Sequence, residues 1–148
     1  MCYALFIAAD RPLDLLEVDD AVDAEVFHLE EPQPQHAVVQ SHLSKPHVYY
    51  AASWQGCGCG WFPNTILLQG PKTRRQSNRR TAADVRALGA LLSAITSESE
   101  SVELYLSWEG ELDEGVKRQT RLVPSDFEAD ALPMEQGDLA IITGDFPS

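Results

Sequence analysis

The sequence predicts an α+β fold: a mainly antiparallel sheet of five to seven strands, with one principal helix (about 81–97) packed on one face. Short apolar or alternating segments recur along the chain, and residues typical of turns separate them. Only one segment carries apolar residues at helical spacing. The chain has 148 residues, of which 44% are hydrophobic. We therefore expect a single domain, 1–148, with enough apolar surface for a core.

Three segments of the first half are expected to be extended. Residues 1–9 are apolar almost throughout, which is typical of a strand at the centre of a sheet. A short strand is expected at 24–29, and a longer one at 47–54, where β-branched and aromatic residues follow one another. The segment 37–43 fits either a strand or a short helical turn.

The principal helix is predicted from four apolar residues at spacings of three and four, which place them on one face: Val85, Leu88, Leu92 and Ile95. Thr81 is expected to cap its first turn. After the helix, 102–108 alternates apolar and polar residues, which indicates a half-exposed strand. We expect 116–123 to return as an edge-like strand of the same hairpin, and 139–143 to form the last strand.

The chain is acidic, with a formal net charge of −12. This charge argues against general affinity for nucleic acid or for an anionic membrane, and a basic protein partner would be favoured electrostatically. No segment approaches the roughly 20 apolar residues of a membrane span. Because Asp10 and Arg11 interrupt the apolar start of the chain, we expect no signal peptide and a cytoplasmic location.

Residues 72–80 carry five of the 11 basic residues, without apolar interruption. The rest of the chain has 6 basic against 23 acidic residues, a balance of −17. We expect a flexible basic loop at about 70–80 that lies on the acidic body. The alternative is a contact with phosphate or a carboxylate ligand, for which the arginine fork is suited, through Arg74, Arg75, Arg79 and Arg80.

The run from Gly56 to Gly60 holds Cys57 and Cys59, each flanked by glycine, and Cys2 is the third cysteine. Glycine allows tight turns, and glycine amides can approach a thiolate closely and donate hydrogen bonds to it. In a reducing compartment, closely spaced cysteines more often bind metal or react than form static disulfides. These features predict a transition-metal site, zinc first, whose metal would be structural or sensory.

A tetrahedral zinc site needs three or four protein ligands. Cys2 would be the third if the first strand lies beside the strand ending at Trp54. His47 is the fourth candidate, although it lies ten residues before Cys57 and would have to fold back from up to roughly 33 Å. The remaining histidines are alternatives of equal standing: His28, His36 and His42.

Other roles remain open for the same residues. The cysteines would be simple packing groups under Trp61 and Phe62 in a non-enzymatic interaction module with an acidic surface. In a hydrolase, Cys2 would be an N-terminal nucleophile, or His47 would activate Cys57 or Cys59. A Cys57–Cys59 disulfide would be strained and therefore readily reduced.

The stretches Met1-Cys2-Tyr3, Pro46-His47-Val48-Tyr49-Tyr50 and Gly56-Cys57-Gly58-Cys59-Gly60 give the chain a resemblance to known proteins. It resembles a group of small bacterial proteins of unknown activity that start Met-Cys-Tyr. They carry Pro-His-x-Tyr-Tyr shortly before Gly-Cys-Gly-Cys-Gly-aromatic. The resemblance covers about a third of the chain. It implies a bacterial cytoplasmic protein and groups Cys2, His47, Cys57 and Cys59 as one constellation.

Overall fold

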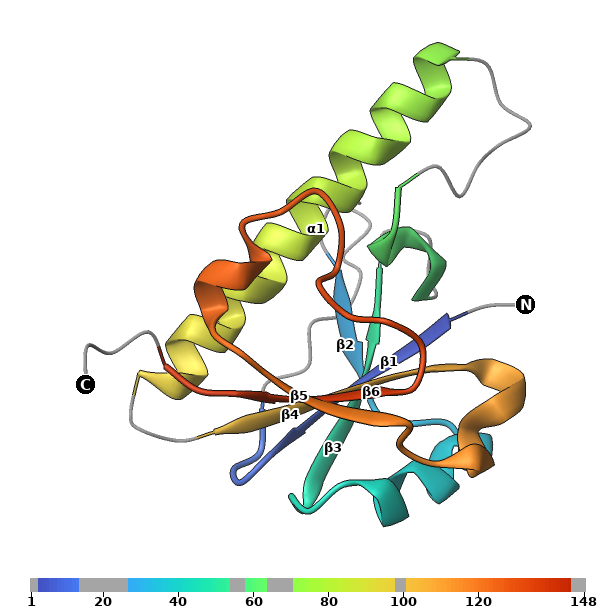
Figure 1. Ribbon diagram of the computed structural model, residues 1–148, viewed down its shortest axis with the longest axis vertical. Helices are drawn as coiled ribbons and strands as arrows, with labels where there is room; N and C mark the ends of the chain where they lie inside the picture. The colour runs from blue at the N-terminus through green and yellow to red at the C-terminus, as the bar shows by residue number, and fades with distance from the viewer. Residues whose placement is uncertain (1–2, 14–26, 54–57, 64–70, 98–100, 145–148) are drawn as a thin grey trace.

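Residues 3–13, 27–53, 58–63, 71–97 and 101–144 are described in the computed structural model. They form six strands: Tyr3–Ala9 (β1), His28–Glu30 (β2), His47–Ala52 (β3), Val102–Trp108 (β4), Arg118–Leu122 (β5) and Asp138–Ile142 (β6). The strands make one sheet in the order β2-β3-β1-β4-β6-β5 (Figure 1). All neighbours are antiparallel except β5 and β6, which are parallel. The predicted α+β class, with its mainly antiparallel sheet, is confirmed.

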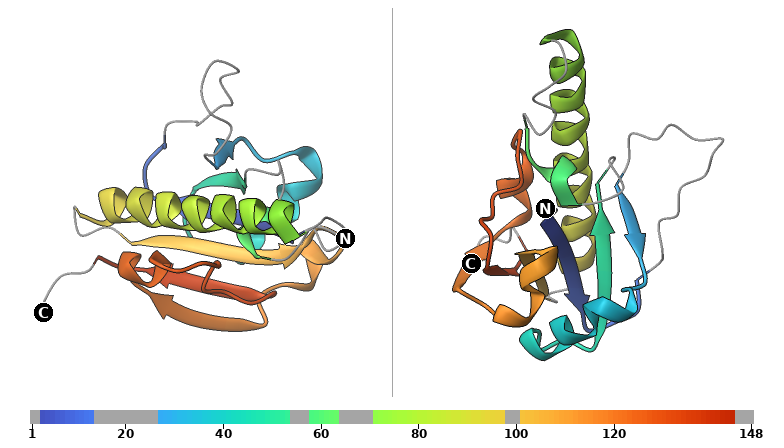
Figure 2. Two further views of the ribbon diagram at one scale, coloured as in Figure 1. Left: turned by 90° about the horizontal axis from the view of Figure 1, so that it is seen from above. Right: turned by 90° about the vertical axis from the view of Figure 1, so that its right-hand side faces the viewer.

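One long helix, α1 (Pro71–Thr96), covers one face of the sheet (Figure 2). Its four predicted apolar residues are all buried there, in one cluster with Leu5 and Ile7 of β1 and Leu104 of β4. The central position predicted for the first strand is also confirmed, because β1 lies between β3 and β4. Within the described part of the chain, no helix combines the length and apolar character that a membrane crossing requires.

The helix begins ten residues earlier than the apolar pattern predicts. Residues 72–80, expected as a flexible basic loop, form the first turns of α1, and Thr81 lies inside the helix rather than at its cap. The first helical residue is a proline, whose fixed backbone angle suits that position, and arginine and lysine are good helix formers. The apolar pattern indicates only the part of the helix that packs on the sheet. It misses the first turns because most of 71–80 is exposed.

The second face of the sheet is covered by two 3₁₀ helices, η1 (Pro34–His42) and η3 (Glu109–Glu114). A second apolar cluster lies there and includes Phe6, Val39, Tyr105 and Leu112. The ambiguous segment 37–43 is therefore mostly η1. The expectation of a half-exposed β4 is wrong, because these helices bury its polar-facing side as well.

The predicted hairpin of 102–123 does not form either, because β6 inserts between β4 and β5. Four of the five residues of β6 are buried. Strand β5 has three exposed residues, Arg118, Gln119 and Arg121. An apolar strand gains more from an inner position, and a polar strand tolerates the edge. The edge-like character predicted for 116–123 is thus confirmed, while its pairing partner is not.

Candidate thiol site

Cys59 is half-buried in a short 3₁₀ helix, η2 (Gly58–Trp61), and Cys2 and Cys57 lie outside the described residues. Trp61 fixes this turn to the sheet. Its indole is fully buried, and Nε1–H donates a hydrogen bond of 3.1 Å to the carbonyl oxygen of Ala51 in β3. The structure therefore holds Cys59 near the end of β3.

The start of β1 lies at the same end of the sheet. Leu5 is paired with Ala51, and the ring of Tyr3 lies 4.8 Å from the ring of Phe62, the residue after Trp61. The first strand thus runs beside the third, which is the arrangement that the sequence argument required. Cys2 directly precedes Tyr3 in the sequence.

His47 lies at the other end of β3. It is paired with Ala9, the last residue of β1, whereas Ala51 is paired with Leu5. Four residues of extended chain separate His47 from Ala51, which corresponds to about 13 Å. The strand does not fold back between them. The register therefore separates His47 from Cys59 and does not bring them into one coordination sphere.

Two of the alternative histidines are engaged elsewhere. His36 accepts a hydrogen bond at Nδ1 from the Gln33 amide (3.0 Å), and its Nε2 lies 3.2 Å from the carboxylate of Glu109. His42 donates from Nε2 to the Leu112 carbonyl at 2.8 Å. Both histidines lie in η1, and Glu109 and Leu112 lie in η3, so these contacts hold the two 3₁₀ helices together.

His28, unlike His47, lies at the end of the sheet that holds η2, but its side chain lies on the other face. It is paired with Ala52 of β3, at the same end as η2, and the preceding Phe27 ring lies 5.6 Å from that of Trp61. Phe27 and Leu29 both belong to the cluster beneath α1. Because residues alternate along a strand, His28 faces the opposite side of the sheet.

A buried carboxylate on α1 is a further feature that the sequence argument missed. Asp84 is completely buried. It follows Ala82 and Ala83, which line a hollow together with Pro63, two residues beyond Trp61. Buried carboxylates are costly unless they are paired, hydrogen-bonded or bound to a cation, and Asp84 has an interaction partner within the protein. The only sequence signal was an acidic residue between the apolar positions of the helix.

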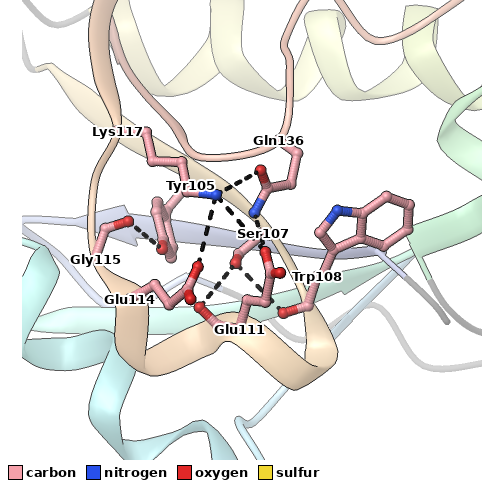
Figure 3. A network of polar contacts seen from close by, with 8 residues as sticks. All are labelled: Tyr105, Ser107, Trp108, Glu111, Glu114, Gly115, Lys117 and Gln136. Atoms are coloured by element: carbon pink, nitrogen blue, oxygen red, sulfur yellow. Dashed lines mark hydrogen bonds and ion pairs between the residues drawn. The ribbon is translucent and has the colours of Figure 1, made fainter.

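A cluster of polar side chains surrounds Lys117 (Figure 3). Its Nζ lies 3.2 Å from Gln136 Oε1, 3.6 Å from Glu114 and 3.7 Å from Glu111. Nearby, the buried Tyr105 hydroxyl donates to the Gly115 carbonyl, and burial raises the pKa of Tyr105. These contacts join η3 to β4 and the turn before β6, and we assign them a structural role.

No group of three histidine, cysteine or acidic side chains suited to a metal occurs among the described residues. Of the four predicted ligands, the described part includes Cys59 and His47. Comparison of the chain with protein-family models, curated proteins and solved structures found no match.

Proposed function

We propose that this protein binds a transition-metal ion, zinc first, through Cys2, Cys57 and Cys59. The observation that supports the proposal most is the contact between Tyr3 and Phe62, 4.8 Å between ring centroids. It joins the residue after Cys2 to the turn that carries Cys59. Three thiolates meeting at one sheet end would form a soft ligand set, which favours zinc over magnesium or calcium.

The bound metal would have a structural or sensory role. Three sulfur ligands leave a fourth position, which a water molecule would fill. His47 is left out of the ligand set, because the β1–β3 register places it at the far end of the strand.

Elemental analysis of the protein, purified without a metal-affinity tag, tests the proposal. We expect about one zinc per chain, and thiols that react fully only after chelation. Cys59→Ser should reduce zinc retention strongly, while His47→Ala, the matched control, should leave it unchanged. Less than about a tenth of an equivalent of metal, with three freely reactive thiols, would favour packing cysteines or a thiol enzyme.

A further inference from the structure

A hollow of about 580 Å³ on α1 is lined by three arginines, Arg75, Arg79 and Arg86. They are spaced four and seven residues apart, so they follow one face of the helix. Ala82 and Ala83 form part of the lining between them. We call this surface the arginine groove. Its volume lies within the range of small-molecule sites.

Two of these arginines are available to a ligand. In the part of the chain that the structure describes, no carboxylate pairs with Arg75 or Arg79, and both residues are exposed. Arg86 lies 3.5 Å from Asp130, but the two side chains are 60% and 85% exposed. An ion pair this exposed contributes little, so an incoming anion can replace Asp130.

The charge of the remaining protein limits the size of the ligand. From Arg75 to Arg86 the groove spans 11 residues, about 16 Å along the helix. Beyond residues 72–80, the chain has 6 basic and 23 acidic residues. At physiological salt, two exposed charges interact appreciably only when they lie within about 8 Å of each other. A long polyanion would extend past the groove and meet this acidic surface, whereas a small anion would not.

Phosphate suits the spacing of the two available arginines. Arg75 and Arg79 are one turn apart, about 6 Å along the axis. Guanidinium groups form paired hydrogen bonds with phosphate oxygens, and two such groups can share one phosphate. The small side chains of Ala82 and Ala83 leave room for an organic substituent beside it.

We propose that the arginine groove binds a small organic phosphate. The phosphate lies on Arg75 and Arg79, and its organic part lies over Ala82 and Ala83. This site uses none of the cysteines, so it is independent of the metal proposal.

Titration of the full chain with phenyl phosphate, followed by calorimetry and by amide chemical shifts, tests the proposal. We expect saturable binding at one site, with the largest shifts within 75–86. The double variant Arg75→Gln/Arg79→Gln should bind at least about tenfold more weakly. The control Lys72→Gln/Arg121→Gln removes the same charge at exposed positions outside the groove, and its affinity should stay within about twofold.

The proposal would be overturned by no saturable binding, by equal weakening in both double variants, or by tighter binding of a short RNA oligonucleotide than of phenyl phosphate. Shifts centred outside the groove in the unaltered protein would do the same, whatever the variants do. Zinc content measured in the same samples should not change in Arg75→Gln/Arg79→Gln. Failure of this site is therefore distinguishable from failure of the metal proposal.

Discussion

Replacement of Trp61 should test how firmly the cysteine turn is fixed to the sheet. The indole is fully buried and donates to Ala51 at 3.1 Å. Its backbone carbonyl also accepts a 3.0 Å hydrogen bond from the Leu132 amide. Trp61 thus joins η2, β3 and the segment before β6. The Trp61→Phe variant removes the Nε1 donor and part of the ring, and Trp61→Ala removes the whole side chain.

The expected losses differ in size. For Trp61→Phe, the lost hydrogen bond costs about 1 kcal/mol net, and the smaller ring leaves a cavity that raises the total to about 2 kcal/mol. For Trp61→Ala, truncation of a buried aromatic side chain costs about 3–5 kcal/mol. Val116→Ala is the control. Val116 is 38% exposed, so its truncation should cost no more than about 0.5 kcal/mol.

Urea denaturation followed by far-ultraviolet circular dichroism measures these differences, because the signal does not depend on the tryptophan removed. A loss below about 1 kcal/mol in Trp61→Ala, or no difference from Val116→Ala, would refute the anchoring role of Trp61. If the anchoring holds, Trp61→Ala should also retain zinc more weakly than Val116→Ala, because η2 carries Cys59.

Two further predictions concern packing and pH. In Gly89→Ala, the new Cβ would lie 2.7 Å from Phe127 Cβ. The overpacking should cost about 1–3 kcal/mol, which exceeds the gain in helix propensity of about 1 kcal/mol, so the variant should be less stable. A variant more stable to urea than the parent would contradict this. Burial raises the pKa of Tyr105 above its unfolded value of 10.0, so its contribution to stability is present below pH 10 and is lost as the pH rises through the folded-state pKa. Tyr105→Phe should lose about 1 kcal/mol at pH 7 through its missing hydrogen bond, yet lose less stability than the parent above pH 10; equal alkaline loss in thermal melts would count against that pKa shift.

Local patterns in the sequence predict individual elements well but not their pairing. The alternation within 102–108 matches the bounds of β4, Val102–Trp108. The same alternation suggests an exposed side, since nothing in the sequence shows that η1 and η3 cover it. Likewise, the apolar character of 139–143 predicts a strand. It does not show that this strand, rather than 116–123, lies next to β4.

The candidate site has the same dependence on long-range pairing. The cysteine spacing predicts a metal site at Cys57 and Cys59 without the structure. Whether Cys2 or His47 can join them depends on the register of β1 against β3, which has no local signal. The β1–β3 register places Tyr3 at the end of the sheet near Cys59, and it places His47 at the other end, opposite Ala9. The separate β2–β3 pairing places His28 opposite Ala52, at the end near η2, but on the other side of the sheet from the cluster beneath α1.

X-ray absorption at the zinc edge, on protein loaded with one equivalent of zinc, would show directly whether the cysteines bind the metal. The metal proposal predicts a first shell dominated by about three sulfur atoms at about 2.3 Å, with one oxygen at about 2.0–2.2 Å. Cys59→Ser should remove one sulfur from that shell, and His47→Ala should leave it intact. A shell of nitrogen and oxygen alone, or a shell unchanged by Cys59→Ser, would contradict the account.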